Sequence, residues 1–323
     1  MNKKVKKLLL MTSTLGMLSF AMVGCGNNDS TDTTTEATSE DNSQTSDNSQ
    51  SDFIETNISI SVEEQDGIPA HEIPATLTIP ANTEEKLPAV VMLHGTGSWR
   101  DEAGDGYKIA AGNFAKAGIV SLRIDFMGSG DSTASDTDYC PTSANIDAKA
   151  AADYLAKLDI VNSDAIGVLG WSQGGMNALL AASQYPETFK TVVTWSSSIG
   201  KNPEEEPFKS EYETAKKDGY TVTEFDWREP MKTGLRWYEE VANLNVLEQV
   251  EAYPGPILAI HGLKDDVVPV ETSEKIVEAS ANDKTTSYFI EDCDHTYNVF
   301  SGDLTALNDA INATANYFNE NLK

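Results

Sequence analysis

The sequence predicts an α/β protein built on a mainly parallel sheet with helices on both faces. From about residue 87 onward, short apolar runs alternate with helix-length periodic segments, which is the order of elements that forms parallel sheets. Before that region, residues 58–62 and 72–79 alternate apolar and polar side chains, as an antiparallel hairpin at a sheet edge would. One long interval, residues 199–254, interrupts the alternation.

The elements expected in the alternating region are short strands and amphipathic helices. Strands are predicted at residues 89–93, 120–124, 165–170, 191–194, 257–260 and 286–290, and helices at about residues 107–117, 144–158, 175–184, 271–281 and 303–319. The interrupting interval has no strand-like run, but it carries charged and aromatic residues on plausible short helices. An insertion of that length favours a lid over a structureless loop.

The N-terminus has the pattern of a secretory signal. Residues 1–7 contain four lysines and no acid, and residues 8–23 are largely apolar. The run Met22-Val23-Gly24-Cys25 resembles the lipobox of bacterial lipoproteins, although leucine is more usual where Met22 stands. The resemblance implies a signal peptide over residues 1–24 and lipidation of Cys25. An ordinary signal peptide or a retained signal anchor is the alternative.

The segment after the signal is expected to be a disordered tether, residues 25–52. It consists almost entirely of Asn, Asp, Ser, Thr, Gln and Glu, which bury too little apolar surface to offset the entropy of ordering. Residues 53–323 then form the folded domain, whose length suits one domain with an insertion. We expect this domain outside the cytoplasm, held to the cell membrane by the lipid on Cys25.

Charge and cysteine content exclude several classes of protein. The formal charge of −28 makes nucleic acid and anionic lipid poor partners. With Cys25 lipidated, only Cys140 and Cys293 are left, too few for a disulfide framework or a cysteine-rich zinc site. If the loops that carry Cys140 and Cys293 are neighbours, one bridge is possible; two unpaired thiols are the favoured alternative.

The segment from Gly170 to Gly174 matches G-x-S-x-G, with an apolar strand before it and the helical run MNALLAA after it. Its glycines allow a sharp strand-to-helix turn that exposes the hydroxyl of Ser172. The helix N-terminus then lies beside developing negative charge. We therefore predict Ser172 as a nucleophile, with a purely structural glycine-rich turn as the alternative.

A serine nucleophile needs a base within hydrogen-bond reach, and the base is usually histidine. In chains with this elbow the order is nucleophile, acid, base, which excludes His71 and His94. His261 ends a predicted buried strand and has no suitable acid between it and Ser172. His295 follows the last predicted strand and is the predicted base.

The acid that orients the base is expected in the loop after the preceding strand. Residues 261–269, HGLKDDVVP, supply two adjacent carboxylates there, Asp265 and Asp266. The acid would fix the imidazole tautomer and stabilise the imidazolium. Spacing alone does not choose between the two.

An oxyanion hole requires backbone N–H donors near the reacting carbon. The residue after the nucleophile, Gln173, supplies one. The second is expected from the turn His94-Gly-Thr-Gly97 after the first parallel strand, and Thr96 is the candidate. A purely structural turn is the alternative.

Together these motifs resemble the α/β-hydrolase superfamily. The D-x-x-G-x-G-x-S loop of residues 125–132 and the acid loop of residues 261–269 are similar to motifs of that superfamily, in which the aspartate three before the valine is the triad acid. The resemblance, which runs from about Asn57 to Lys323, implies an eight-stranded sheet and favours Asp265. The lid position is most like feruloyl and cinnamoyl esterases and related carboxylesterases, which often have an aromatic residue where Thr96 stands.

The function implied by the resemblance is hydrolysis of a small-molecule ester through an acyl-enzyme, with no metal or organic cofactor. A serine peptidase of the aminopeptidase type is the alternative, whereas the lack of a propeller-length N-terminal extension counts against prolyl oligopeptidases. A binding lipoprotein without catalysis is a third hypothesis, because fold does not imply function.

Overall fold

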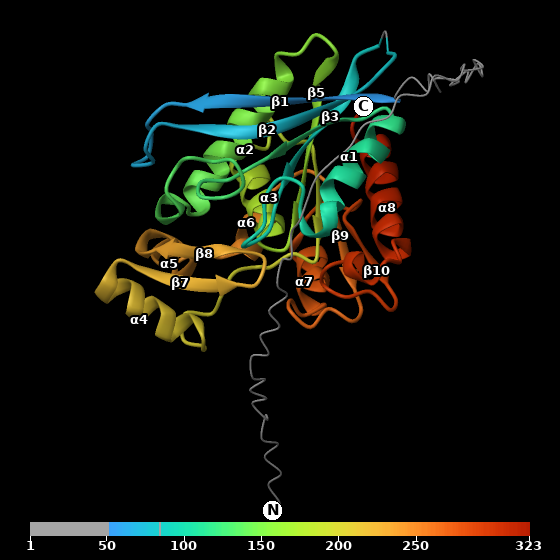
Figure 1. Ribbon diagram of the computed structural model, residues 1–323. Helices are drawn as coiled ribbons and strands as arrows, with labels where there is room; N and C mark the ends of the chain where they lie inside the picture. The colour runs from blue at the N-terminus through green and yellow to red at the C-terminus, as the bar shows by residue number, and fades with distance from the viewer. Residues whose placement is uncertain (1–51, 84) are drawn as a thin grey trace, which may run out of the picture. The chain divides into compact units, whose positions relative to one another are not determined.

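The computed structural model describes residues 52–83 and 85–323 (Figure 1). The predicted signal peptide, the lipidated Cys25 and the tether up to residue 51 lie outside the described residues. The strands are β1 (Phe53–Val62), β2 (His71–Pro80), β3 (Leu87–Leu93), β4 (Val120–Ile124), β5 (Val161–Trp171), β6 (Thr191–Trp195), β7 (Tyr220–Phe225), β8 (Arg228–Gly234), β9 (Ile257–Gly262) and β10 (Thr286–Ile290). The helices are α1 (Gly106–Lys116), α2 (Pro141–Ala156), α3 (Gln173–Gln184), α4 (Phe208–Asp218), α5 (Leu235–Ala242), α6 (Val246–Ala252), α7 (Glu271–Ala279) and α8 (Thr305–Asn321).

Eight of the strands form one mixed sheet in the order β1-β2-β4-β3-β5-β6-β9-β10. The six strands from β4 to β10 in that order are parallel to their neighbours, and β2 pairs antiparallel with both β1 and β4. The predicted parallel sheet with an antiparallel hairpin at its edge is therefore confirmed. After β3 the chain moves to β4 on one side, and after β4 it crosses to β5 on the other. Such a reversal places the ligand crevice of open α/β sheets at the carboxyl ends of the strands.

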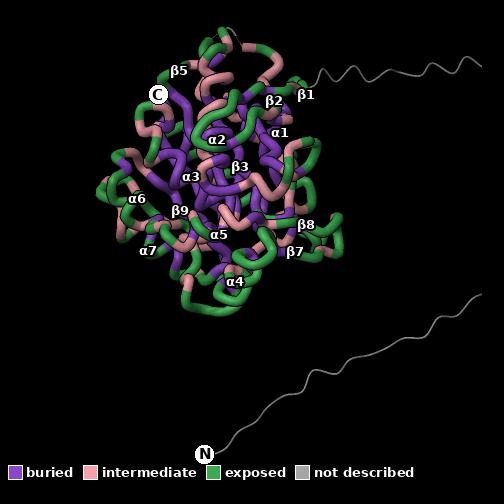
Figure 2. Tube along the Cα trace, turned by 90° about the vertical axis from the view of Figure 1, so that its left-hand side faces the viewer, coloured by how far each residue is buried: buried purple, intermediate pink, exposed green. Residues whose placement is uncertain are grey.

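The helices cover both faces of the sheet because the central strands are apolar on both sides. Within β3, Val90 and Met92 pack with α1 and α8, while Ala89, Val91 and Leu93 pack with α2 and α3. This alternation follows from the two-residue period of a strand. Figure 2 shows buried segments at the centre of the molecule, around β3, α3 and β9, and a largely exposed α4.

The interval between β6 and β9 departs from the prediction, because it contains two strands as well as helices. The strands β7 and β8 pair antiparallel with each other and form a separate two-stranded sheet. We call residues 199–245, which include α4, β7, β8 and α5, the insert. The expectation of no strand here is wrong: β7 and β8 are mostly exposed, so they lack the apolar runs by which the other strands were identified.

The insert has a small apolar core of its own, formed by Phe208, Ala215, Tyr238 and Val241. The following helix α6 packs instead against α3 and belongs to the main core through Val246 and Val250. Within the described residues, no helix combines the length and the apolar character needed to cross a bilayer.

Candidate active site

Ser172 lies at the turn between β5 and α3, in a backbone conformation that few side chains adopt, with φ 57° and ψ −119°. The two flanking glycines permit this turn. A Cβ on Gly170 would lie 2.0 Å from the Gly174 carbonyl oxygen, and one on Gly174 would lie 2.0 Å from the Leu93 oxygen. The Ser172 N–H donates to the Trp195 oxygen at 2.8 Å. The turn thus fixes the serine at the carboxyl ends of β3, β5 and β6.

The structure brings Ser172, His295 and Asp265 together from three separate loops. The Nε2 atom of His295 lies 3.0 Å from Ser172 Oγ, and its Nδ1 atom lies 2.7 Å from Asp265 Oδ2. Both contacts are satisfied when Nδ1 carries the proton and Nε2 accepts from the serine hydroxyl. The side chain of Asp265 is 0% exposed, whereas Asp266 is an exposed residue. The geometry therefore pairs His295 with Asp265 and leaves Asp266 at the surface.

The carboxylate of Asp265 is held by several donors. Its Oδ1 atom accepts hydrogen bonds from the N–H groups of Val267 and Val268, at 2.9 and 2.8 Å. Burial raises the pKa of this carboxyl, but hydrogen bonds from His261, His295 and the Val268 N–H outweigh burial and hold the pKa well below its usual range. Asp265 is consequently ionised at neutral pH and can act as a permanent acceptor for His295.

The residues that carry the two predicted oxyanion donors are Thr96, in the loop after β3, and Gln173, the first residue of α3. The Thr96 hydroxyl donates to Gln173 Oε1, which links the two side chains. In residues 52–83 and 85–323, the backbone N–H groups of Thr96 and Gln173 donate to no protein acceptor. Unpaired N–H groups at this position are what an oxyanion hole requires.

Comparison with known protein families identifies the chain. A model of the prolyl oligopeptidase family, peptidase family S9, matches residues 111–323, more than half of the chain. The chain belongs to the prolyl oligopeptidase family. The expectation that disfavoured prolyl oligopeptidases is therefore wrong at the level of the family. The matched region contains Ser172, Asp265 and His295 but begins after Thr96.

Individual relatives of this family member include hydrolases. Serine hydrolase BPHL from Homo sapiens is 27% identical over 197 residues, 56% of this chain and 64% of the human protein. The same protein from Mus musculus is 27% identical over 157 residues, 45% of this chain and 53% of the mouse protein. The matches thus span less than two thirds of the length of these curated relatives.

Solved structures similar to this chain have the α/β-hydrolase fold. Est1E from Butyrivibrio proteoclasticus, solved with ferulic acid bound, has a TM-score of 0.65 and 23% identity, covering 82% of this chain and 98% of Est1E. The α/β hydrolase GrgF from a Penicillium species has a TM-score of 0.67 and 15% identity, covering 83% and 99%. Dienelactone hydrolase from Anabaena variabilis has a TM-score of 0.57 and 18% identity, covering 84% and 100%. The predicted α/β-hydrolase fold is therefore confirmed.

In this prolyl oligopeptidase family member, the insert contacts the loop that carries Thr96. The turn between β7 and β8 places Phe225 against Gly97, where an added Cβ would lie 2.6 Å from the ring. The indole N–H of Trp227 donates to the Gly97 oxygen at 3.1 Å, although the residue is 61% exposed. An aromatic pair from the insert therefore lies directly beside the proposed oxyanion donor.

Sequence reasoning assigned no role to two polar residues beside the site, His261 and Tyr139. His261, rejected as the base, is fully buried, and its Nε2 atom lies 3.1 Å from Asp265 Oδ2. Its second ring nitrogen lies 2.8 Å from Ser273 Oγ. The hydroxyl of Tyr139 accepts from Gln173 Nε2 at 3.1 Å and from Asn177 Nδ2 at 2.7 Å. The only sequence signal for His261 was its position four residues before Asp265.

The two described cysteines do not form a bridge. Cys140 and Cys293 are both buried free thiols. Cys140 belongs to the apolar cluster that includes α2 and α3, whereas Cys293 belongs to the cluster that includes α1 and α8. Different faces of the sheet thus hold the two sulfurs, and the favoured expectation of two unpaired thiols is confirmed.

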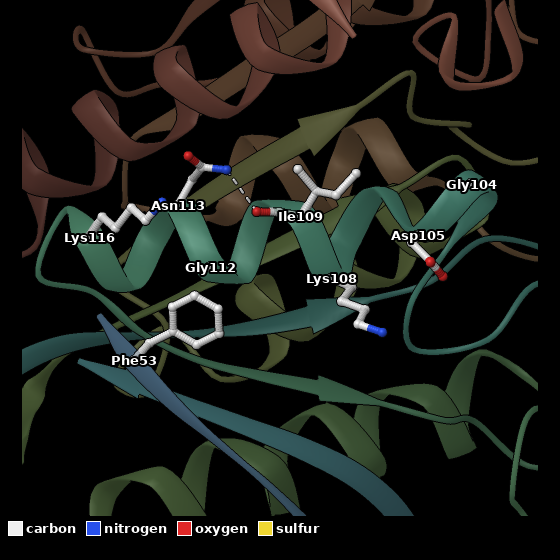
Figure 3. Close-up of a pocket in the computed structure, with 8 residues that line it drawn as sticks. All are labelled: Phe53, Gly104, Asp105, Lys108, Ile109, Gly112, Asn113 and Lys116. Atoms are coloured by element: carbon white, nitrogen blue, oxygen red, sulfur yellow. Dashed lines mark hydrogen bonds between the residues drawn. The ribbon is translucent and has the colours of Figure 1, made fainter. Parts of the chain in front are cut away.

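Two hollows on the surface lie away from the Ser172 turn. One, of about 380 Å³, lies on α1 and is lined by Phe53, Gly104, Asp105, Lys108, Ile109, Gly112, Asn113 and Lys116 (Figure 3). The other, of about 590 Å³, lies beside α4 and β7. Within the described residues, no group of three or more His, Cys, Asp or Glu side chains is arranged to hold a metal ion.

Proposed function

We propose that this chain hydrolyses carboxylic esters through an acyl-enzyme on Ser172, with His295 as general base and Asp265 as the acid that orients it. The observation that carries the proposal is the continuous hydrogen-bonded path from Asp265 Oδ2 through the imidazole to Ser172 Oγ. A serine at a strained strand-to-helix turn with such a partner has the arrangement of an activated nucleophile.

The acylation step follows from these contacts. Ser172 Oγ attacks the ester carbonyl carbon while His295 Nε2 accepts the hydroxyl proton, and the carbonyl electron pair moves onto oxygen. The N–H groups of Gln173 and Thr96 donate to that oxyanion. As the tetrahedral intermediate collapses, the bond to the alcohol oxygen breaks, and His295 returns the proton to the departing alcohol. Asp265 stabilises the transient imidazolium.

Deacylation repeats the same sequence with water. His295 removes a proton from a water molecule, the hydroxyl adds to the acyl carbon, and the intermediate collapses to release the carboxylic acid and restore Ser172. In both steps, His295, Ser172, the substrate and water donate and accept every proton that moves. The proposal therefore calls on no metal or organic cofactor.

The proposed substrate is a small ester with an apolar or aromatic part. Phe225 and Trp227 lie beside the proposed oxyanion donor and offer ring surface to such a group. The structural similarity to Est1E, which binds ferulic acid in its solved structure, supports the same class.

A peptidase is the second candidate, because the family match favours it. The same three residues would cleave a peptide bond if His295 protonated a departing amine in place of an alcohol. Nitrophenyl esters of increasing acyl length, methyl ferulate and aminoacyl anilides, assayed side by side, separate the two. Esterase activity with no anilide cleavage is expected, and preferential anilide cleavage would favour the peptidase.

Labelling with a fluorophosphonate probe tests the nucleophile. The wild type should react, and Ser172→Ala should not. On nitrophenyl esters, Ser172→Ala and His295→Ala should each lower kcat by at least ~10³, and the double variant should lose little more, since the residues act as a unit. A wild type that neither reacts with the probe nor cleaves any substrate would support the third hypothesis, a binding lipoprotein without catalysis.

The two adjacent aspartates provide an internal control for the acid. Asp265→Asn should lower kcat far more than Asp266→Asn, because only Asp265 contacts His295. Equal losses in the two variants would contradict the assignment of Asp265.

We also propose that the protein is extracytoplasmic and held to the cell membrane by a lipid on Cys25. The support is the sequence around Cys25 alone. Two acyl chains suffice for stable anchoring, whereas one gives only reversible binding. Cys25→Ser should abolish labelling by radioactive palmitate and should release active protein or stall its processing. Membrane retention without palmitate labelling in the wild type would remove the proposal.

A further inference from the structure

Glu102 is a buried carboxylate beside the proposed oxyanion hole, and the mechanism above does not use it. The residue is 5% exposed. Its Oε1 atom accepts from the Gly95 N–H, and its Oε2 atom accepts from Ser98 Oγ at 2.8 Å and from the Ala103 N–H at 2.9 Å. A single carboxylate thus holds both ends of the turn formed by residues 95–98, which carries Thr96.

The backbone of Glu102 adopts a conformation that is essentially reserved for glycine, with φ 61° and ψ −179°. Such a strained conformation persists only where the contacts around it are strong enough to hold it. At Glu102 the three hydrogen bonds to the side chain hold the backbone in this conformation. Backbone strain of this kind is concentrated at functional sites.

The turn held by Glu102 lies against the nucleophile. A Cβ built on Gly95 would lie 3.2 Å from Ser172 Cβ and 3.3 Å from Glu102 Oε1. Because Glu102 occupies the Gly95 N–H, that group is not available to an oxyanion. The next N–H along the chain, that of Thr96, donates to no protein acceptor within residues 52–83 and 85–323.

The direction of the Thr96 N–H is fixed by the same turn. In a trans peptide the N–H of Thr96 points opposite to the Gly95 carbonyl. That carbonyl accepts from His94 Nδ1 at 2.9 Å and from the Ser98 N–H at 3.3 Å. Since Glu102 holds the side chain of Ser98 and the N–H of Gly95, loss of its carboxylate would free this peptide plane to rotate.

We propose that Glu102 is a positioning residue for the oxyanion hole: its carboxylate holds the Gly95–Ser98 turn so that the Thr96 N–H points at the developing oxyanion. The inference rests on the proposed function, since it assumes that Ser172 attacks a carbonyl carbon. A donor that is aimed before the reaction stabilises the transition state more than the bound substrate. Glu102 therefore acts on kcat and not on KM.

Two variants test the role. Glu102→Gln keeps the shape but leaves one amide NH₂ facing an N–H donor, so the turn loses part of its support. Glu102→Gly relieves the backbone strain, because glycine adopts this conformation freely, and removes the carboxylate entirely. Asp105→Asn is the matched control, because it removes one negative charge at an exposed position three residues away.

The measurements are kcat and KM on a nitrophenyl ester, the inhibition constant of a phenylboronic acid, the inhibition constant of the product acid, and Tm. Both Glu102 variants should lose about 10- to 100-fold in kcat. Affinity for the boronic acid, which forms a tetrahedral adduct, should fall in parallel, while KM and product-acid binding stay within about twofold. Asp105→Asn should match the wild type in all four.

Several results would overturn the inference. One is a Glu102→Gly variant that folds with wild-type kcat, and another is a rise in KM at constant kcat. If both Glu102 variants lose their cooperative unfolding transition, Glu102 holds the fold and not the donor. Failure of the proposed function looks different: the wild type would then neither cleave the ester nor react with a fluorophosphonate.

Discussion

The strand β3 and the hairpin of β7 and β8 differ in how far their residues are buried. In β3 the residues from Ala89 to Leu93 are all buried, and helices cover both sides. In β7, Val222 is 49% exposed and most other residues are exposed too. The sheet body is thus held by buried apolar packing, whereas the exposed hairpin of the insert contacts the body through several hydrogen bonds.

Three of the hydrogen bonds between insert and body come from the hairpin, and others come from Arg236 and Glu240 of α5. The Lys232 N–H donates to Asp136 Oδ2 at 2.6 Å, Arg228 Nη2 donates to the Gly128 oxygen at 3.0 Å, and the Trp227 indole donates to the Gly97 oxygen. Each such hydrogen bond contributes only about 0.5–1.5 kcal/mol net. Segments with few buried apolar contacts open at low free energy, as substrate lids generally do. We therefore expect the insert to open at a lower free energy than the body, which carries the proposed reacting groups.

The largest expected contrast is between two glycines. In the body, a Cβ at Gly174 would lie 2.0 Å from the Leu93 oxygen, so Gly174→Ala should destabilise the protein by more than about 3 kcal/mol. In the insert, Gly219 has φ 87° with nothing within 4 Å of an added Cβ, so Gly219→Ala should cost only about 1–2 kcal/mol of strain. Urea unfolding followed by circular dichroism measures both. Equal losses would refute the difference between body and insert.

The second contrast concerns thiol reactivity. Burial raises the pKa of Cys140 to about 11, and burial together with the charges of Asp294 and Asp265 raises the pKa of Cys293 to about 12. Because the thiolate is the nucleophile and an ordinary thiol has a pKa near about 8.5, both should alkylate at least about 100-fold more slowly than a free thiol at pH 8.

The insert supplies the matched control for this experiment. Lys216→Cys places a thiol on the exposed face of α4, and it should react with iodoacetamide at the ordinary rate. Peptide mass mapping follows each cysteine separately, and urea should make all of them reactive. Rapid alkylation of Cys293 in the folded protein would show that the body opens near His295 as easily as the insert does.

The body was predictable from sequence for the same physical reason that makes it stable. The expected strands at residues 89–93 and 257–260 lie within β3 and β9, because a continuous apolar run between turn signals has few alternatives to a buried strand. In the insert, β8 contains Arg228, Glu229 and Lys232 and forms through pairing with β7. No apolar pattern marks such a strand.

The residues of the proposed site that belong to sequence motifs could be predicted. The residues that reach the site only through tertiary contacts could not. The elbow and the histidine loop carry motifs, so Ser172 and His295 could be proposed from order and spacing, whereas the choice of Asp265 over Asp266 came from the family resemblance. Glu102 belongs to no motif, because its role depends on a turn that returns the side chain to Gly95 in space. The contact between Trp227 and Gly97 joins residues 130 positions apart, which no local pattern records.

The third contrast is between two buried phenylalanines. Phe318 of the body is fully buried, and Phe318→Ala should cost about 3–5 kcal/mol in global stability. Phe208 is 4% exposed within the small core of the insert, so Phe208→Ala should mainly unfold the insert. Hydrogen exchange should then rise in α4, β7 and β8, with the body unchanged. Phe300→Ala, at a residue 74% exposed, is the control and should change stability by less than about 0.5 kcal/mol.

The smallest expected effect on stability is at the tip of the hairpin. Trp227 is 61% exposed, so Trp227→Ala should change the free energy of unfolding by less than about 1 kcal/mol, the net contribution of one hydrogen bond. The ring nevertheless lies beside the loop of Thr96, so the variant should raise KM for aromatic esters a fewfold while leaving kcat near the wild-type value.

Trp227→Phe separates the two properties of the side chain, because it keeps a ring but loses the donor to Gly97. Recovery of KM in Trp227→Phe would assign the effect to ring contact with the substrate, and no recovery would assign it to the hydrogen bond that docks the insert. A fall in kcat at constant KM would instead show that the insert helps to fix the oxyanion donor, and the division between a fixed body and an adaptable insert would fail at this contact.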